Sequence, residues 1–145
     1  MTTASRQAPY AAVERLLFSK LVSGVAFPIF TKLPNGVIPT SLFAIINTPF
    51  NSATSDNLTI GRAAGGNAAN PIAANASAYK SGLDIKGTAA GTRTDATVLP
   101  GAINDASGGL NLTVTWTGVG TAPTAGEVIV VMNCLDTNRE HFTQG

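Results

Sequence analysis

The stretch Leu110-Asn111-Leu112-Thr113-Val114-Thr115-Trp116-Thr117 alternates apolar and polar side chains without interruption. This period of two is typical of a half-buried antiparallel β-strand with its apolar side chains on one face. A nine-residue connection (118–126) with three glycines and one proline follows, and then a β-branched run (127–135). We expect this second run to be buried on both faces. The two segments are predicted to pair as a β-hairpin.

Further short strands are indicated on the N-terminal side of this pair. Residues 25–30 are apolar but contain Pro28, which favours an edge strand or a bulged strand. Residues 33–36 (Leu-Pro-Asn-Gly) predict a turn, because proline presets φ and glycine supplies a positive φ. Residues 42–46 are apolar on both faces, as in a strand between two layers, and residues 58–60 predict a short strand.

The remaining segments are less regular. Residues 61–109 are rich in alanine and glycine, and we interpret them as short strands and close-packed loops. Residues 13–22 fit an amphipathic helix and a strand about equally well. About eight short strands at roughly ten-residue spacing favour an antiparallel sandwich, jelly roll or barrel over any alternation of strands and helices.

Both ends of the chain differ in composition from the predicted domain. Residues 1–12 are small, polar and interrupted by proline, and residues 136–145 are polar. We therefore predict an N-terminal arm (1–12), one domain (13–135) and a C-terminal tail (136–145). A chain of 145 residues has the usual length of a single domain.

The charge balance argues against several classes of protein. Nine basic and eight acidic residues leave a net charge of +1, without the basic excess of a nucleic-acid-binding protein. Such low charge suits a chain that ends up in an assembly. No apolar run reaches about 18 residues, which argues against a membrane span, and residues 1–9 lack the features of a secretory signal. We expect synthesis in a reducing cytoplasm.

The side chains that carry chemistry are few and scattered. The sole histidine, His141, lies in the polar tail, and the sole cysteine, Cys134, lies in the most apolar strand, where a small buried side chain is expected. Loop aspartates such as Asp84 more often cap turns than act in catalysis. Trp116 continues an apolar strand face, so we expect it in the core or an interface rather than on a sugar-stacking platform. We therefore predict no enzyme activity, no metal and no cofactor.

The order of the turn and strand segments resembles that of a known group. A Leu-Pro-x-Gly-x-Ile turn (33–38) precedes a strand that ends in Asn-Thr-Pro-Phe-Asn-Ser-Ala-Thr-Ser-Asp (47–56), and Leu-Thr-Ile-Gly (58–61) follows. Near the end, Ala-Pro-Thr-Ala-Gly-Glu (122–127) leads into Val-Ile-Val-Val (128–131). Over residues 13–135 this order resembles the small β-rich virion proteins of tailed bacteriophages, especially the cement (decoration) proteins of the icosahedral head.

This resemblance implies an all-β, jelly-roll-like antiparallel sandwich in which residues 13–19 form a strand. It also implies a structural protein on the outer surface of the virion, made in the cytoplasm of the bacterial host. Such a protein bridges neighbouring major capsid proteins and associates with itself, for which we favour a dimer over a trimer. No direct contact with nucleic acid or membrane is expected.

Candidate contact residues lie in the two terminal segments and beside prolines. For the terminal segments, simple fraying is an equal alternative, and for at least two of the phenylalanines an ordinary core position is the favoured interpretation. The candidates are Arg6, Tyr10, Phe27, Phe30, Phe50, Arg139 and Phe142.

Two other functions fit a small β-rich protein of this kind. One is a carbohydrate- or receptor-binding module of a tail fibre or spike, which requires an exposed aromatic platform built from Trp116, Tyr10 or Tyr79. The other is a tail-tube or connector subunit, which stacks in rings and belongs to tails rather than heads.

Overall fold

The computed structural model describes residues 9–31, 36–66, 71–100 and 111–136. Within them lie ten strands and one 3₁₀ turn, η1 (Phe18–Lys20). Two strands, β5 (Gly65–Gly66) and β6 (Pro71–Ile72), pair only with each other. The other eight are β1 (Pro9–Leu17), β2 (Ala26–Ile29), β3 (Val37–Thr48), β4 (Ser55–Arg62), β7 (Asn75–Asp84), β8 (Arg93–Asp95), β9 (Leu112–Val119) and β10 (Glu127–Asp136).

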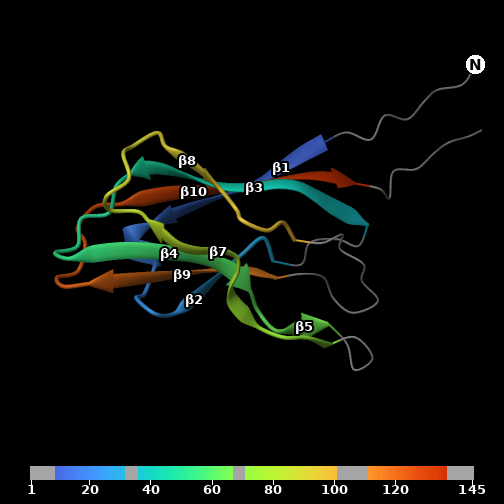
Figure 1. Cartoon of the computed structure of the whole chain (residues 1–145), viewed down its shortest axis with the longest axis horizontal. Coiled ribbons are helices and arrows are strands. Elements are labelled where there is room, and N and C mark those ends of the chain that lie inside the picture. The colour runs from blue at the N-terminus through green and yellow to red at the C-terminus, as the bar shows by residue number, and fades with distance from the viewer. Residues whose placement is uncertain (1–8, 32–35, 67–70, 101–110, 137–145) are drawn as a thin grey trace, which may run out of the picture.

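These eight strands form two four-stranded sheets that lie one above the other (Figure 1). The first sheet has the order β1-β10-β3-β8, and the second has the order β2-β9-β4-β7. Along the chain, the first strand pairs antiparallel with the last, the second with the second to last, and so on inward. This nesting is the jelly-roll arrangement, in which successive strands lie in opposite sheets except for the innermost pair, β4 and β7. The predicted all-β, jelly-roll-like sandwich is confirmed.

The predicted hairpin of residues 110–117 and 127–135 is wrong. β9 lies in the second sheet between β2 and β4, whereas β10 lies in the first sheet between β1 and β3. The physical reason is the length of the connection, since residues 118–126 can span the roughly 10 Å between stacked sheets and no two-residue turn forces the strands to pair. Both segments do form strands, β9 from Leu112 and β10 from Glu127, but they do not pair with each other.

Specific contacts hold the connection between β9 and β10 in its crossing path. The side-chain oxygen of Asn51 accepts hydrogen bonds from the backbone N–H of Thr124 (2.8 Å) and Ala125 (3.0 Å). Gly126 has a φ of 149°, and a Cβ there would lie 2.4 Å from the ring of Phe50. The connection therefore needs a glycine at its end, because only glycine allows both this backbone and this close approach.

β1 resolves the ambiguity of residues 13–22 in favour of a strand as far as Leu17, whereas Phe18 and Ser19, also expected in that strand, lie in η1. It also moves the expected boundary of the arm. The strand begins at Pro9 and pairs continuously with β10, from Pro9 opposite Leu135 to Leu17 opposite Glu127. Residues 9–12 therefore belong to the sheet rather than to an arm, because their backbone completes the ladder beside β10. At the other end, β10 includes Asp136, the first residue of the predicted tail.

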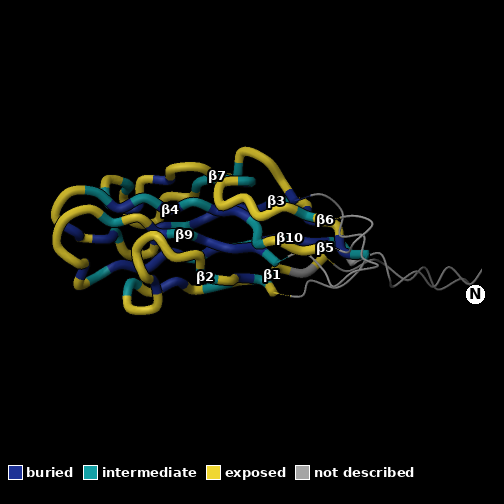
Figure 2. The backbone as a smooth tube through the Cα atoms, turned by 90° about the horizontal axis from the view of Figure 1, so that it is seen from below, coloured by how far each residue is buried: buried dark blue, intermediate teal, exposed yellow. Residues whose placement is uncertain are grey.

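The core lies between the sheets, where the buried stretches of the strands face each other (Figure 2). β10 alternates between buried and half-buried residues, so only one of its faces is fully buried, contrary to the prediction for residues 127–135. β3 likewise has Ile45 half-buried on its outer side. The largest fully buried side chains are Phe50, Leu16, Ile29, Leu42, Ile46, Leu58, Ile60, Ile85, Leu112, Met132, Val37 and Val114.

Candidate interaction surfaces

The outer face of the first sheet carries apolar side chains on its three long strands. Register places Val13, Val131 and Phe43 side by side across β1, β10 and β3, and the next row holds Arg15, Ile129 and Ile45. Val13 is 56% exposed, and Ile129, Val131 and Ile45 are half-buried. Because side chains alternate along a strand, these residues point away from the core. We call Val13, Val131, Phe43, Ile129 and Ile45 the apolar face.

An arginine with an acidic partner stands on each side of the apolar face. On β1, the guanidinium of Arg15 donates from Nε to Glu127 Oε1 at 2.7 Å. On β8, Arg93 donates from Nε to Asp95 Oδ1 at 2.9 Å and covers the ring of Phe43, with its guanidinium carbon 3.8 Å from the ring centroid. The cation–π contact shields Phe43 from solvent and keeps the cation on the surface.

The ion pair of Arg15 and Glu127 also shifts a titration. The hydrogen bond from Arg15 is the main cause that holds the pKa of Glu127 below its ordinary value of 4.5, and a hydrogen bond from Asn47 adds to it. Glu127 is thus an anion at neutral pH, and the charge of Arg15 is balanced locally. Both sides of the apolar face are therefore polar, but the charge of each arginine is balanced by its acidic partner.

The outer face of the second sheet has a different chemistry. Register places Asn57 beside Thr117 and Thr59 beside Thr115 on β4 and β9. These four side chains are half-buried or exposed, and the hydroxyl of Thr59 donates to the carbonyl of Thr115 at 3.3 Å. The centre of this face therefore presents hydroxyl and amide groups, which water solvates well.

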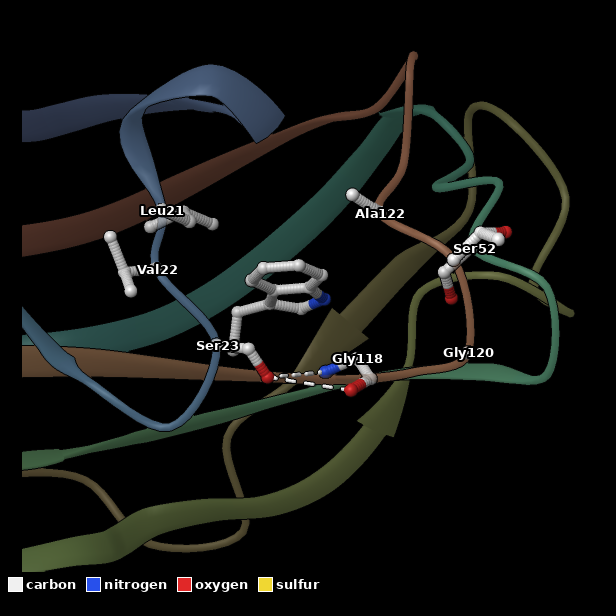
Figure 3. Close-up of a pocket in the computed structure, with 9 residues that line it drawn as sticks. Leu21, Val22, Ser23, Ser52, Gly118, Gly120 and Ala122 are labelled. Atoms are coloured by element: carbon white, nitrogen blue, oxygen red, sulfur yellow. Dashed lines mark hydrogen bonds between the residues drawn. The ribbon is translucent and has the colours of Figure 1, made fainter.

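A surface pocket of about 350 Å³ opens at one end of β9. Figure 3 shows Leu21 and Val22 on one side of it and Ser52 and Ala122 on the other, with Ser23 bonded to the backbone of Gly118. A Cβ on Gly118 would lie 2.3 Å from the ring of Trp116, so this wall is closed to larger residues. The lining residues are Leu21, Val22, Ser23, Ser52, Trp116, Gly118, Gly120, Thr121 and Ala122.

A buried carboxylate organises the floor of this pocket. Asp56 is fully buried, and its Oδ1 accepts the indole N–H of Trp116 at 2.9 Å. Its Oδ2 accepts the backbone N–H of Ser52 at 3.0 Å and the Ser52 hydroxyl at 2.6 Å. Three donors satisfy the carboxylate, so it positions the indole and the loop after β3. We assign Asp56 a structural role.

The predicted contact residues occupy several different places. Phe50 is 2% exposed, with its ring 5.9 Å from that of Trp116, so it is a core side chain and presents no surface for a partner. Phe27 and Phe30 are half-buried against the core, and Phe30 has a φ of 46°, which is rare for a bulky residue. Tyr10 lies in β1 opposite Cys134. Arg6, Arg139 and Phe142 lie outside the described residues.

The aromatic side chains expected for a sugar-binding platform are buried where they are described. Trp116 is 6% exposed and Tyr79 is 4% exposed. Burial raises the pKa of the Tyr79 hydroxyl above its ordinary value, although Arg62 opposes the shift. Neither ring presents a face on which a sugar could stack.

Among the described residues, the side chains that could carry chemistry have structural roles. Cys134 is fully buried in β10, and Asp84 caps a turn by accepting the N–H groups of Lys86 (2.9 Å) and Gly87 (2.7 Å). His141 lies outside the described residues. No group of three or more His, Cys, Asp or Glu among the described residues is placed to hold a metal ion. In the same part of the chain, no helix is long and apolar enough to span a membrane.

A solved virus structure contains a chain of the same fold. A chain of the cyanophage Pam1 capsid asymmetric unit superposes with a TM-score of 0.60 over 88% of this protein and 84% of that chain, at 16% sequence identity. At this identity the likeness is one of fold. No protein-family model matches the sequence, and no curated protein does either.

Sequence reasoning missed the residues of the apolar face. The run at residues 128–131 is apolar at both alternating positions, and it was interpreted as a strand buried on both faces. The same pattern arises when one face is core and the other is an apolar surface. Arg15 and Arg93 carried no sequence signal, because they are brought to opposite sides of the face only by the strand order β1-β10-β3-β8.

Proposed function

We propose that this protein is a structural component of a bacteriophage virion, which coats the outside of the head and bridges neighbouring major capsid proteins. The observation that carries the proposal is the shared jelly-roll fold, which covers most of both this chain and a chain of a phage capsid asymmetric unit. In this proposal the protein is made in the host cytoplasm, associates with itself, most simply as a dimer, and catalyses no reaction.

The apolar face gives the proposal a physical basis. Burial of apolar surface supplies affinity without direction, while the arginines at the two sides of the face add polar contacts that fix orientation. Each contact can be modest, because copies that also contact each other bind the shell as one multivalent coat. The hydroxyl-rich outer face of the second sheet would then remain in water.

The test is a quantitative analysis of purified particles of the virus that carries the gene. Heads and tails are separated, and the copy number of this protein in each fraction is measured against that of the major capsid protein. We expect a copy number in heads comparable to that of the major capsid protein. Recovery in tails alone would favour a tail-tube, connector or fibre role instead.

A second measurement tests the stabilising role directly. Heads with and without the bound protein are heated, and release of packaged DNA is followed by the fluorescence of an intercalating dye. The coated heads should release DNA at a higher temperature. Deleting residues 1–8 or residues 137–145 tests the predicted terminal contacts, and these deletions spare the paired residues of β1 and β10.

A further inference from the structure

Two four-stranded sheets have four open edges, and three of these edges are poorly suited to pairing with another chain. β2 is four residues long and contains Pro28, and β8 has three residues, two of which are an ion pair. β7 is longer, but its pairing with β4 is interrupted twice, and Gly82 has a φ of 59°. Short strands, prolines, charges and irregularities are the usual means of protecting a sheet edge.

The fourth edge, β1, is longer and more regular than the other three, although it carries Glu14 and Arg15. It pairs with β10 over nine residues without a register shift, and the only proline is at its first position. Its outward side chains include Val13 and Leu17, both exposed. Such a long, regular and partly apolar edge is a template for strand addition.

The direction of the backbone groups on β1 follows from one hydrogen bond. The N–H of Phe18 donates to the carbonyl of Gly126 at 3.0 Å, at the end of the ladder with β10. Because bonded and non-bonded positions alternate in an antiparallel pair, the even-numbered residues of β1 face β10. The N–H and C=O groups of Ala11, Val13, Arg15 and Leu17 therefore point to the open edge, where no described strand pairs with them.

We infer that this edge pairs with the β1 strand of a second copy, antiparallel, across a two-fold axis at Val13. In this register Val13 lies opposite Val13 of the other copy, Ala11 opposite Arg15, and Pro9 opposite Leu17. Each of the central pairs exchanges two main-chain hydrogen bonds. The pairing joins the two first sheets into one continuous sheet with an isologous interface.

Charge disfavours the registers in which the axis moves towards the C-terminal end of β1. With Val13 on the axis, Glu14 lies opposite Ala12 and Arg15 opposite Ala11, so no like charges are directly opposed. Moving the axis to residue 14 opposes the two Glu14 side chains, and moving it to residue 15 opposes the two Arg15 side chains, both of which are unfavourable. The register centred on Val13 also overlaps the whole strand, nine residues on nine.

A second copy is the occupant that these observations favour, because the strand overlaps itself over its whole length in this register and opposes no like charges. The inference deepens the self-association within the proposed function by naming the segment and the register, and it requires no contact with the capsid. It can therefore be tested on the purified full-length protein.

The first experiment measures the dimerisation of three forms by sedimentation velocity: wild type, V13R and V13E. Val13 is 56% exposed, so both variants should fold, which thermal unfolding verifies. We expect wild type to dimerise, each variant alone to dimerise at least about tenfold more weakly, and an equimolar mixture of the two to recover the dimer through an opposite-charge pair. Dimerisation of V13R equal to that of wild type would overturn the inference.

The second experiment tests the register by disulfide formation. A bonded antiparallel pair has its Cα atoms about 5.5 Å apart, within the range that a disulfide accepts. The V13C variant should form a covalent dimer under mild oxidation, and a mixture of A11C and R15C should cross-link more than either alone. V22C is the matched control, because Val22 is similarly exposed but lies outside β1. Equal cross-linking of V13C and V22C would contradict the register.

Two outcomes separate this inference from the proposed function. A wild-type protein that stays monomeric at all concentrations but is present in heads at the expected copy number would overturn the inference alone and leave the proposed function standing. A dimer that behaves as expected, from a protein absent from heads, would leave the inference standing and overturn the proposed function.

Discussion

The two sheets of this sandwich differ on both of their faces. On the outside, the first sheet presents the apolar face, flanked by Arg15 and Arg93, whereas the second presents threonine and asparagine side chains. On the inside, the second sheet is again the more polar of the two. Asp56, whose carboxylate is fully buried, lies in β4 of the second sheet. In contrast, the buried side chains of β10 that point into the core are apolar or cysteine.

The difference separates two tasks. A buried polar network such as that of Asp56, Trp116 and Ser52 defines one arrangement of its neighbours, because any other arrangement leaves donors without partners. An apolar outer face adds little to the folding of a single chain and lowers the free energy only when another molecule covers it. The buried network thus defines the packing within the second sheet, whereas under the proposed function the first sheet is the surface for contacts.

Removal of the buried carboxylate should have the largest effect on stability. D56A leaves the Trp116 indole N–H and the Ser52 backbone N–H without their acceptor, whereas the Ser52 hydroxyl can still donate to the Ser55 carbonyl at 2.9 Å. We expect a loss of about 3 kcal/mol in the free energy of unfolding. Chemical denaturation monitored by fluorescence measures it, because Trp116 is the only tryptophan in the sequence.

Two further variants calibrate this result. D56N keeps an acceptor for the indole but not for both Ser52 donors, so its loss should be intermediate. D95A, at an exposed ion pair, should cost less than about 1 kcal/mol. If D56A and D95A are equally stable, the inner side of the second sheet does not have the role given to it above.

A smaller loss is expected from a methyl group added beside the same indole. In G118A, a Cβ would lie 2.3 Å from Trp116 and 3.1 Å from Asp56 Oδ1, so the ring must shift. Overpacking of this kind costs about 1–3 kcal/mol, and the fluorescence maximum should move with the ring. T117A, at the exposed neighbouring position, is the control. An unchanged spectrum and midpoint in G118A would show that the indole is held less tightly than its contacts suggest.

The fold was predictable where the information is local. The alternation of residues 110–117 correctly predicted which side of β9 is buried, and Pro28 correctly predicted an edge strand. The pairing of β9 and β10 was not predictable in this way, because it depends on partners far away in the sequence. A nine-residue connection permits a hairpin or a crossing between sheets, and nothing within it distinguishes the two.

The candidate surface was harder to predict than the fold. The phenylalanines beside prolines were candidate anchors, with a core position favoured for at least two of them, and Phe50 fills the space beside Gly126 and Trp116 in the core. The residues of the apolar face are aliphatic, and a run such as Val128–Val131 has the same composition whether its outer side meets a second layer or solvent. Only the number of layers in the folded sandwich shows whether the outer side of such a strand is buried or exposed.

Exchange of outer-face chemistry tests the comparison of the sheets most directly. The double variant I129T/V131T gives the first sheet hydroxyl groups like those of the second, and it should bind uncoated heads at least about tenfold more weakly, equivalent to about 1.4 kcal/mol. Its unfolding free energy should fall by less than about 2 kcal/mol, because both side chains are only half-buried. Head binding is measured by co-sedimentation.

The reciprocal variant T115V/T117V is the matched control, since it adds apolar surface to the second sheet. It should bind heads as wild type does. A loss of binding in this variant, with normal binding by I129T/V131T, would reverse the roles assigned to the two outer faces.

The smallest expected effect concerns the ion pair at the edge of the apolar face. The pKa of Glu127 is lowered in the folded protein, chiefly by the hydrogen bond from Arg15, so the folded state binds this proton less readily than the unfolded chain. The stabilisation from this group is therefore present above the ordinary pKa of 4.5 and is lost as the pH falls through the lower folded-state value. The thermal midpoints of wild type and E127Q should converge as the pH falls below about 4.5, and R15A should show the same loss of acid sensitivity. High salt should weaken the effect, because Arg15 is largely exposed. If the midpoint difference between wild type and E127Q stays constant through the acid range, Arg15 and Glu127 form a contact that does not stabilise the first sheet. The geometry at the edge of the apolar face would then depend on the strand ladder alone.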